Sequence, residues 1–198
     1  MEYISTRNNN NKFSFSEIFL KGLAEDGGLF IPSNIEKFDE SKINSLKKLS
    51  YIDLATEIIY LYTGNFLGKK DLNEIIKKSY STFREKDVVK IAVLNQIKIL
   101  ELFHGPTLAF KDIAMQLIGN MYEHFLKSNN KTINIVVATS GDTGAAAIDA
   151  IKGKSNLNIF VLHPNNKISS VQRKIMTTVE EENVFNIAID GNFDDCQN

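Results

Sequence analysis

The sequence contains a lysine, Lys111, in a setting that suits covalent chemistry with an aldehyde. It ends the stretch of residues 104–111, where Gly105 and Pro106 favour a turn and Thr107 is a candidate N-cap of the next helix. The helix dipole repels a cation in the first turn, so this position favours a neutral amine, which can form a Schiff base and move protons. A solvated surface lysine is the alternative interpretation.

A second stretch combines glycines with hydroxyl side chains, between a buried-strand pattern and a helix of small residues. It consists of Thr139, Ser140, Gly141, Asp142, Thr143 and Gly144. Glycines let the backbone approach a ligand closely, and free N–H groups at a helix start bind carboxylates and phosphates. The spacing matches neither GxGxxG nor a P-loop, which argues against a nucleotide. A tight turn capped by Ser140 or Asp142 fits the spacing equally well.

A third junction of strand, loop and helix follows at residues 163–174. Lys167 lies in its loop and is a candidate for binding a substrate phosphate, and Ser169 is a candidate helix cap. The chain has three histidines, which are His104, His124 and His163. They share no metal-ligand spacing, so we expect no metal site.

Short apolar runs alternate with helical patterns after about residue 90, which is typical of a parallel sheet with crossover helices. Strands are expected at residues 97–103, 133–138, 159–162 and 184–189, and helices at residues 108–126, 143–151 and 169–179. The loops that follow parallel strands meet at one edge of a sheet, where ligands of open α/β sheets bind. The three stretches described above all fall on that edge.

The first 90 residues show a mainly helical pattern instead. Helices are expected at residues 14–26, 51–62 and 72–83, with a short extended piece at 29–32. Ser14 and Glu17 fit a capping box for the first helix, Gly64 is a stop signal for the second, and Asp71 is a candidate cap for the third.

The composition argues against several classes of partner. Acidic and basic residues nearly cancel, to a net charge of -1, and no block of one charge indicates a nucleic acid or a membrane surface. The single cysteine, Cys196, excludes an internal disulfide. Without a signal peptide or a membrane-spanning run, we expect a cytoplasmic protein with a small-molecule ligand. Residues 190–198 suggest an uncompleted helix, so we expect a truncated protein.

Together these stretches resemble the threonine synthase family. Residues 102–112 are similar to its pyridoxal phosphate (PLP) lysine motif, residues 138–146 to its glycine-rich substrate loop, and residues 3–7 and 22–32 to its N-terminal signature. The resemblance implies PLP fold type II, as in tryptophan synthase β and cysteine synthase, with the cofactor between two α/β domains. It divides the chain into a mainly helical N-terminal region, 1–90, and an incomplete PLP-binding α/β domain, 91–198.

The resemblance also implies roles for individual residues. Lys111 would carry PLP and move protons at the substrate, and Asp142 would border the cofactor. The residues expected to bind substrate are Thr139, Ser140, Gly141, Asp142, Thr143 and Lys167. The implied reaction converts O-phospho-L-homoserine and water to L-threonine and phosphate, with PLP as the electron sink.

The sequence departs from the family pattern at two positions. Lys167 stands where the family often has Arg, and Ser170 where it often has Pro. A lysine offers a phosphate a point charge and no bidentate contact. The family's loop for the PLP phosphate is expected beyond Asn198, so this chain alone should be inactive. Two alternatives stay open: a related phospho-lyase that makes no threonine, and a non-catalytic relative.

Overall fold

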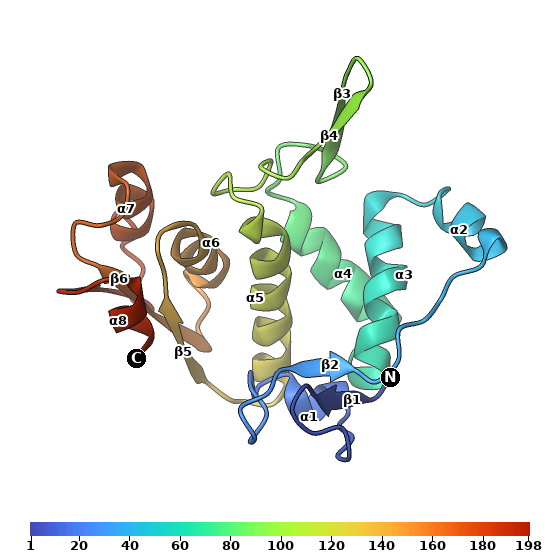
Figure 1. Ribbon diagram of the computed structural model, residues 1–198, viewed down its shortest axis with the longest axis horizontal. Helices are drawn as coiled ribbons and strands as arrows, with labels where there is room; N and C mark the ends of the chain where they lie inside the picture. The colour runs from blue at the N-terminus through green and yellow to red at the C-terminus, as the bar shows by residue number, and fades with distance from the viewer. The chain divides into compact units, whose positions relative to one another are not determined.

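The computed structural model describes all residues, Met1–Asn198 (Figure 1). Its contacts divide the chain into two compact units, Met1–Lys77 and Lys78–Asn198. The domain boundary expected from the sequence, between residues 90 and 91, stays a prediction. None of the helices combines the length and the apolar character that crossing a membrane requires.

The first unit is built from short strands and helices. They are β1 (Tyr3–Ser5), α1 (Phe15–Ile18), β2 (Phe30–Pro32), α2 (Glu40–Leu46), α3 (Tyr51–Thr63), the 3-10 helix η1 (Gly64–Phe66) and α4 (Lys69–Tyr80), whose last residues belong to the second unit. β1 and β2 pair antiparallel. Phe15 and Phe19 pack against Phe66, with ring centroids 5.1 and 4.9 Å apart, so aromatic contacts hold α1 against η1.

The capping and stop signals in the sequence predicted some of the bounds of these helices and not others. The capping box of Ser14 and Glu17 is confirmed, but α1 ends at Ile18 and not near residue 26. Gly22, at φ 71°, adopts a left-handed conformation that a right-handed helix cannot include. α3 has nearly the predicted extent and ends at Thr63, with Gly64 as its C-cap.

The predicted start of α4 is wrong by three residues. The carbonyl of Gly68 accepts a bond from the N–H of Leu72, so the helix begins at Lys69. Asp71 lies inside the first turn and does not cap it, and the helix ends at Tyr80, before the predicted residue 83.

The second unit contains the predicted parallel sheet. β5 (Ile133–Ala138), β6 (Leu157–Pro164) and β7 (Val184–Ile189) lie in the order β5-β6-β7, and both pairings are parallel. The connecting helices are α6 (Asp142–Ile151) and α7 (Ser170–Thr177). α5 (Lys111–Ser128) precedes β5, and α8 (Phe193–Gln197) follows β7. The unit is therefore an α/β structure, as expected.

The expected strand at residues 97–103 is present as β4 (Ile97–Glu101), but it does not join the parallel sheet. It pairs antiparallel with β3 (Lys90–Leu94), which the sequence analysis did not predict. Only Asn95 and Gln96 separate the two strands, and Asn95 has φ 55°. A two-residue connection permits only an antiparallel hairpin, which extends away from α5 in Figure 1.

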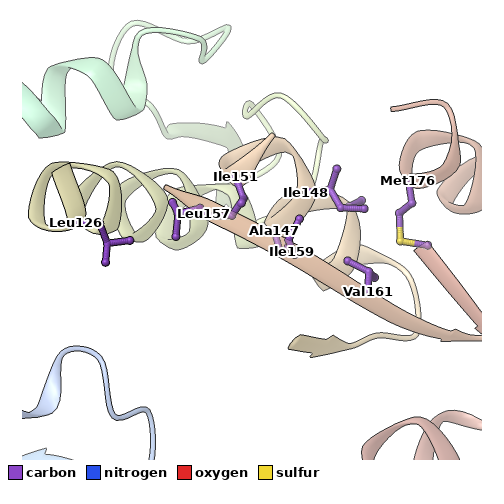
Figure 2. Close-up of a cluster of buried hydrophobic side chains, with 9 residues drawn as sticks. Leu126, Ala147, Ile148, Ile151, Leu157, Ile159, Val161 and Met176 are labelled. Carbon is purple, nitrogen blue, oxygen red and sulfur yellow. The ribbon is translucent and has the colours of Figure 1, made fainter. Parts of the chain in front are cut away.

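One hydrophobic core lies between the sheet and its helices (Figure 2). Leu157, Ile159 and Val161 alternate along β6 with the same side facing inward, and each is 0% exposed. They pack with buried residues of α5, α6 and α7, which are Leu126, Ala145, Ala147, Ile148, Ile151 and Met176. This core fixes the helix starts relative to the strand ends, where the candidate site lies.

Candidate active site

Lys111 is the first residue of α5, at the end of the loop that follows β4. It is half-buried, and its Nζ lies 4.7 Å from the centroid of the Phe110 ring. The lysines that form ion pairs with carboxylates in this structure do not include Lys111. Its amine is therefore not committed to a structural salt bridge.

The prediction that Thr107 caps α5 is wrong. The residue before the helix is Phe110, which makes no side-chain capping bond. Thr107 instead donates its backbone N–H and its hydroxyl to the two carboxylate oxygens of Asp112, at 2.9 and 2.6 Å. Asp112 is 0% exposed, and burial raises the pKa of its carboxyl, an effect that the bonds from Thr107 oppose.

Thr139 holds the loop between β5 and α6. It is 1% exposed, and its Oγ1 accepts the N–H groups of Gly141, at 3.0 Å, and Gly144, at 2.8 Å. The residue before the helix is Gly141, and it makes no side-chain capping bond. The alternative in which Ser140 or Asp142 caps the helix is therefore wrong. A buried hydroxyl from the end of the strand takes that role.

The two glycines of this loop stand at positions that do not accommodate a side chain. A Cβ on Gly141 would lie 2.5 Å from Oε1 of Gln172, and the residue has φ 140°. A Cβ on Gly144 would lie 2.5 Å from Cγ2 of Thr139 and 2.8 Å from Sδ of Met176. At Gly144 the buried neighbours leave no room for a side chain, and at Gly141 the φ of 140° disfavours any residue with a Cβ, so the loop depends on residues without side chains.

The packing of α5 on α6 brings their N-terminal ends to the same side of the unit. Nε2 of Gln116 donates to Oδ2 of Asp149 at 2.7 Å, and Nζ of Lys154, which follows the end of α6, donates to Oδ1 of Asn120 at 2.8 Å. These contacts join the middle of α5 to the last turn of α6 and to the residues that follow it. From the Gln116 contact the helices extend back by only about 8 and about 10 Å to their first residues.

These first residues are Lys111 on α5 and Asp142 on α6. Thr143 follows as the second residue of α6 and is half-buried, while Ser140 is exposed in the loop. The structure therefore gathers the lysine and the hydroxyl residues of the second stretch at one edge of the unit.

Gln172 lies in the candidate site and was not predicted by the sequence analysis. Its Nε2 donates to Oδ1 of Asp142, and its Oε1 accepts the hydroxyl of Ser169 at 2.9 Å. Ser169 caps α7 as predicted, since its Oγ accepts the N–H of Gln172 at 3.2 Å. The spacing of Ser169 and Gln172 is that of a capping box, which was the available signal.

Lys167 lies exposed in the loop between β6 and α7. Through Ser169 and Gln172, this loop is joined to the loop that carries Asp142. No direct bond links Lys167 itself to the other predicted site residues, so it lies at the rim of the group.

The sequence is similar to those of known threonine synthases. Residues 2–80 match the family model described as threonine synthase N terminus. The chain is 43% identical over 198 residues to the threonine synthase of Pseudomonas aeruginosa, covering 100% of this chain and 42% of that relative. Against the threonine synthase of Saccharomyces cerevisiae, the identity is 45% over 211 residues, covering 98% of this chain and 41% of the relative.

Solved structures of threonine synthases have the same fold. The PLP-bound threonine synthase from Brucella melitensis superposes with a TM-score of 0.91 at 42% identity, covering 100% of this chain and 43% of that one. The fold is accordingly PLP fold type II, of which the chain holds a part. It spans about two fifths of the length of the curated relatives that it matches. In motif, sequence and fold, the chain is thus similar over its whole length to the N-terminal part of threonine synthases.

Proposed function

We propose that this chain supplies the cofactor lysine and the substrate loop of a PLP-dependent threonine synthase. The reaction is the conversion of O-phospho-L-homoserine and water to L-threonine and phosphate. The observation that carries the proposal is the placement of Lys111 and the Thr139–Gly144 loop at neighbouring helix starts, in a chain whose relatives are named threonine synthases. A small-molecule substrate and a cytoplasmic location are part of the same proposal.

The residues present fit PLP in two respects. Lys111 offers a primary amine without an ion-pair partner at the start of a helix. The Gly141–Gly144 turn is a cradle that a Cβ at either glycine would fill, and it presents backbone N–H groups to an anion. When bound, PLP would supply an electron sink for carbanions at the substrate. This chain offers no assigned partner for the phosphate of the cofactor.

The proposed work of the chain's own residues is binding, orientation and proton transfer. Lys111 would hold the cofactor through its amine, and the same amine would move protons at the substrate carbons Cα and Cβ. Ser140, Gly141 and Thr143 orient the substrate carboxylate, and Thr139 keeps their loop in place. Asp142, whose carboxylate accepts a bond from Gln172, would border the cofactor.

Lys167 has a separate role in the proposal, at the rim of the site. Its charge would attract the substrate phosphate without fixing its orientation, because an ammonium group is a point charge. Exposure of Lys167 in its loop is consistent with contact to a ligand that enters from solvent.

The proposal is tested by trapping the cofactor on the full gene product that carries this sequence. The protein is incubated with PLP, reduced with borohydride and mapped by peptide mass spectrometry. We expect a pyridoxyl adduct at Lys111 that is absent in Lys111→Ala. Lys69→Ala is the matched control, because Lys69 is also the first residue of a helix but is paired with Glu57 at 2.6 Å. It should keep the adduct.

The products of phosphohomoserine turnover then decide between related reactions. Equal amounts of threonine and phosphate support the proposal. Phosphate without threonine would indicate a phospho-lyase, and a folded protein without an adduct at Lys111 would overturn the PLP mechanism.

A further inference from the structure

Asp112 is a buried charged residue to which the proposed reaction assigns no role. It is 0% exposed, directly follows Lys111, and both of its carboxylate oxygens accept hydrogen bonds from Thr107. A buried carboxylate is stable only when it is hydrogen-bonded or paired, so these two bonds are worth more than surface contacts. They close a ring that contains every residue between Thr107 and Asp112, including Lys111.

The bonded segment has a backbone that needs such a restraint. Leu108 has φ 64°, a left-handed conformation that is uncommon for a residue with a branched side chain. Gly105 approaches so closely that a Cβ there would lie 2.4 Å from both Cβ and Oδ2 of Asp112. The turn is therefore packed onto the Asp112 side chain, and local preference alone would not keep it in this conformation.

Asp112 does not act as an ordinary helix cap. A cap lies before the helix and accepts N–H groups from its first turn, whereas Asp112 lies within the first turn and reaches back to the preceding loop. Since both oxygens are used by Thr107, the carboxylate is oriented toward the loop. Its bonds fix the direction from which the chain enters α5 at Lys111.

We propose that Asp112 is a positioning residue for Lys111, acting through its two hydrogen bonds to Thr107. The inference rests on the proposed function, because it concerns how the cofactor lysine is aimed. Displacement of a reacting group by about 1 Å can lower a rate by about a hundredfold, so restraint of the turn should matter for catalysis. The hydrogen bonds carry the effect, and the negative charge does not.

The test uses Thr107→Val in the full gene product. Valine keeps the shape of threonine and removes only the hydroxyl bond to Asp112, while the backbone bond remains. We expect kcat to fall about tenfold with little change in KM. We also expect slower covalent trapping of PLP at Lys111, and a shifted pH midpoint in the absorbance of the bound cofactor. Thr107→Ser restores the hydroxyl and should restore all three readouts.

Asp112→Asn separates hydrogen bonding from charge. The amide oxygen can accept the N–H of Thr107 while the amide nitrogen donates to its hydroxyl oxygen, so both bonds can be kept without the charge. We expect trapping and kcat within about threefold of the original protein. A loss as large as that of Thr107→Val or larger would overturn positioning by hydrogen bonds and assign the role to charge.

Thr56→Val is the matched control for a purely structural effect. Thr56 is 3% exposed, its hydroxyl donates to the carbonyl of Ile52 at 2.8 Å, and it lies in the first unit. If Thr107→Val changes the catalytic readouts no more than Thr56→Val at equal thermal stability, the positioning role is overturned. If the protein without substitutions gives no adduct at Lys111, the proposed function is overturned, and this inference with it.

Discussion

The turn that enters α5 and the turn that enters α6 are each held by one buried polar side chain. In the turn before α5 that side chain is the carboxylate of Asp112, which lies inside the helix and reaches back to Thr107. In the second it is the hydroxyl of Thr139, which lies at the strand end and reaches forward to two glycine N–H groups. Both turns present the residues on which the proposed chemistry depends.

The difference between the two holding groups follows from what each turn must present. In the proposed function the α6 turn binds an anion, and a neutral hydroxyl can organise its N–H groups without repelling that ligand. In the same proposal the α5 turn presents the amine of Lys111, and a carboxylate turned toward the loop forms no ion pair with that amine. Among the buried holding groups, a carboxylate thus holds the turn that presents a side chain, and a hydroxyl holds the turn that presents backbone N–H groups.

Thr139→Val should have the largest effect, because it breaks the neutral holding group. It leaves the N–H groups of Gly141 and Gly144 without an acceptor in a buried loop, at about 1–3 kcal/mol each. We expect a loss of about 2–4 kcal/mol in the free energy of unfolding, measured by urea titration. Thr139→Ser should recover most of it.

Thr143→Val is the control for Thr139→Val on the same loop. Its hydroxyl does not hold the turn, so stability should change by less than about 0.5 kcal/mol, while the KM for substrate should rise. Equal destabilisation by the two valine variants would show that Thr139 has no special holding role.

Gly119→Ala should have an intermediate effect, because it changes how the two turns are aligned. A Cβ at this position of α5 would lie 2.6 Å from the carbonyl oxygen of Ala150 on α6. Overpacking of this kind costs about 1–3 kcal/mol, offset by up to about 1 kcal/mol of better helix propensity. We expect a net loss of about 1–2 kcal/mol in urea and weaker retention of PLP.

Ala114→Leu adds volume to an exposed position of the same helix. It should leave both stability and PLP retention nearly unchanged. If it lowers PLP retention as much as Gly119→Ala, alignment through the contact of α5 with α6 is not the cause.

Elements with a complete local signal could be predicted from the sequence. The strands at residues 133–138 and 184–189 have the predicted bounds, because a run of β-branched apolar residues between turn residues identifies a buried strand by itself. Lys111 was likewise placed at a helix start by its neighbours Gly105 and Pro106. The strand at 97–103 was assigned to the wrong sheet, because its pairing depends on the short turn at Asn95.

The groups that hold the site could not be predicted, because their partners come from tertiary contacts. Thr107 lies where a helix cap is expected from the sequence. Once the turn folds onto the helix, however, its N–H and its hydroxyl both donate to the carboxylate of Asp112. Gln172 meets Asp142 only after α6 and α7 pack on the same sheet. An acidic residue in the first turn of a helix is explained by the helix dipole alone, so the position of Asp112 in the sequence does not indicate its bonds to Thr107.

The smallest expected effect is the dependence of stability on pH. It distinguishes the carboxylate of Asp112, which titrates, from the hydroxyl of Thr139, which does not. Burial raises the pKa of Asp112 above its usual value of 3.8. Its contribution to stability is therefore complete below pH 3.8 and is lost as pH rises through the pKa of the folded state. Relative to Asp112→Asn, the original protein should lose stability over that range, as measured by urea unfolding at a series of pH values. Thr139→Ser should show the same pH slope as the original protein, because a hydroxyl does not titrate there. A slope of the opposite sign would mean that the bonds from Thr107 outweigh burial, and that Asp112 is fully ionised at no cost to the fold.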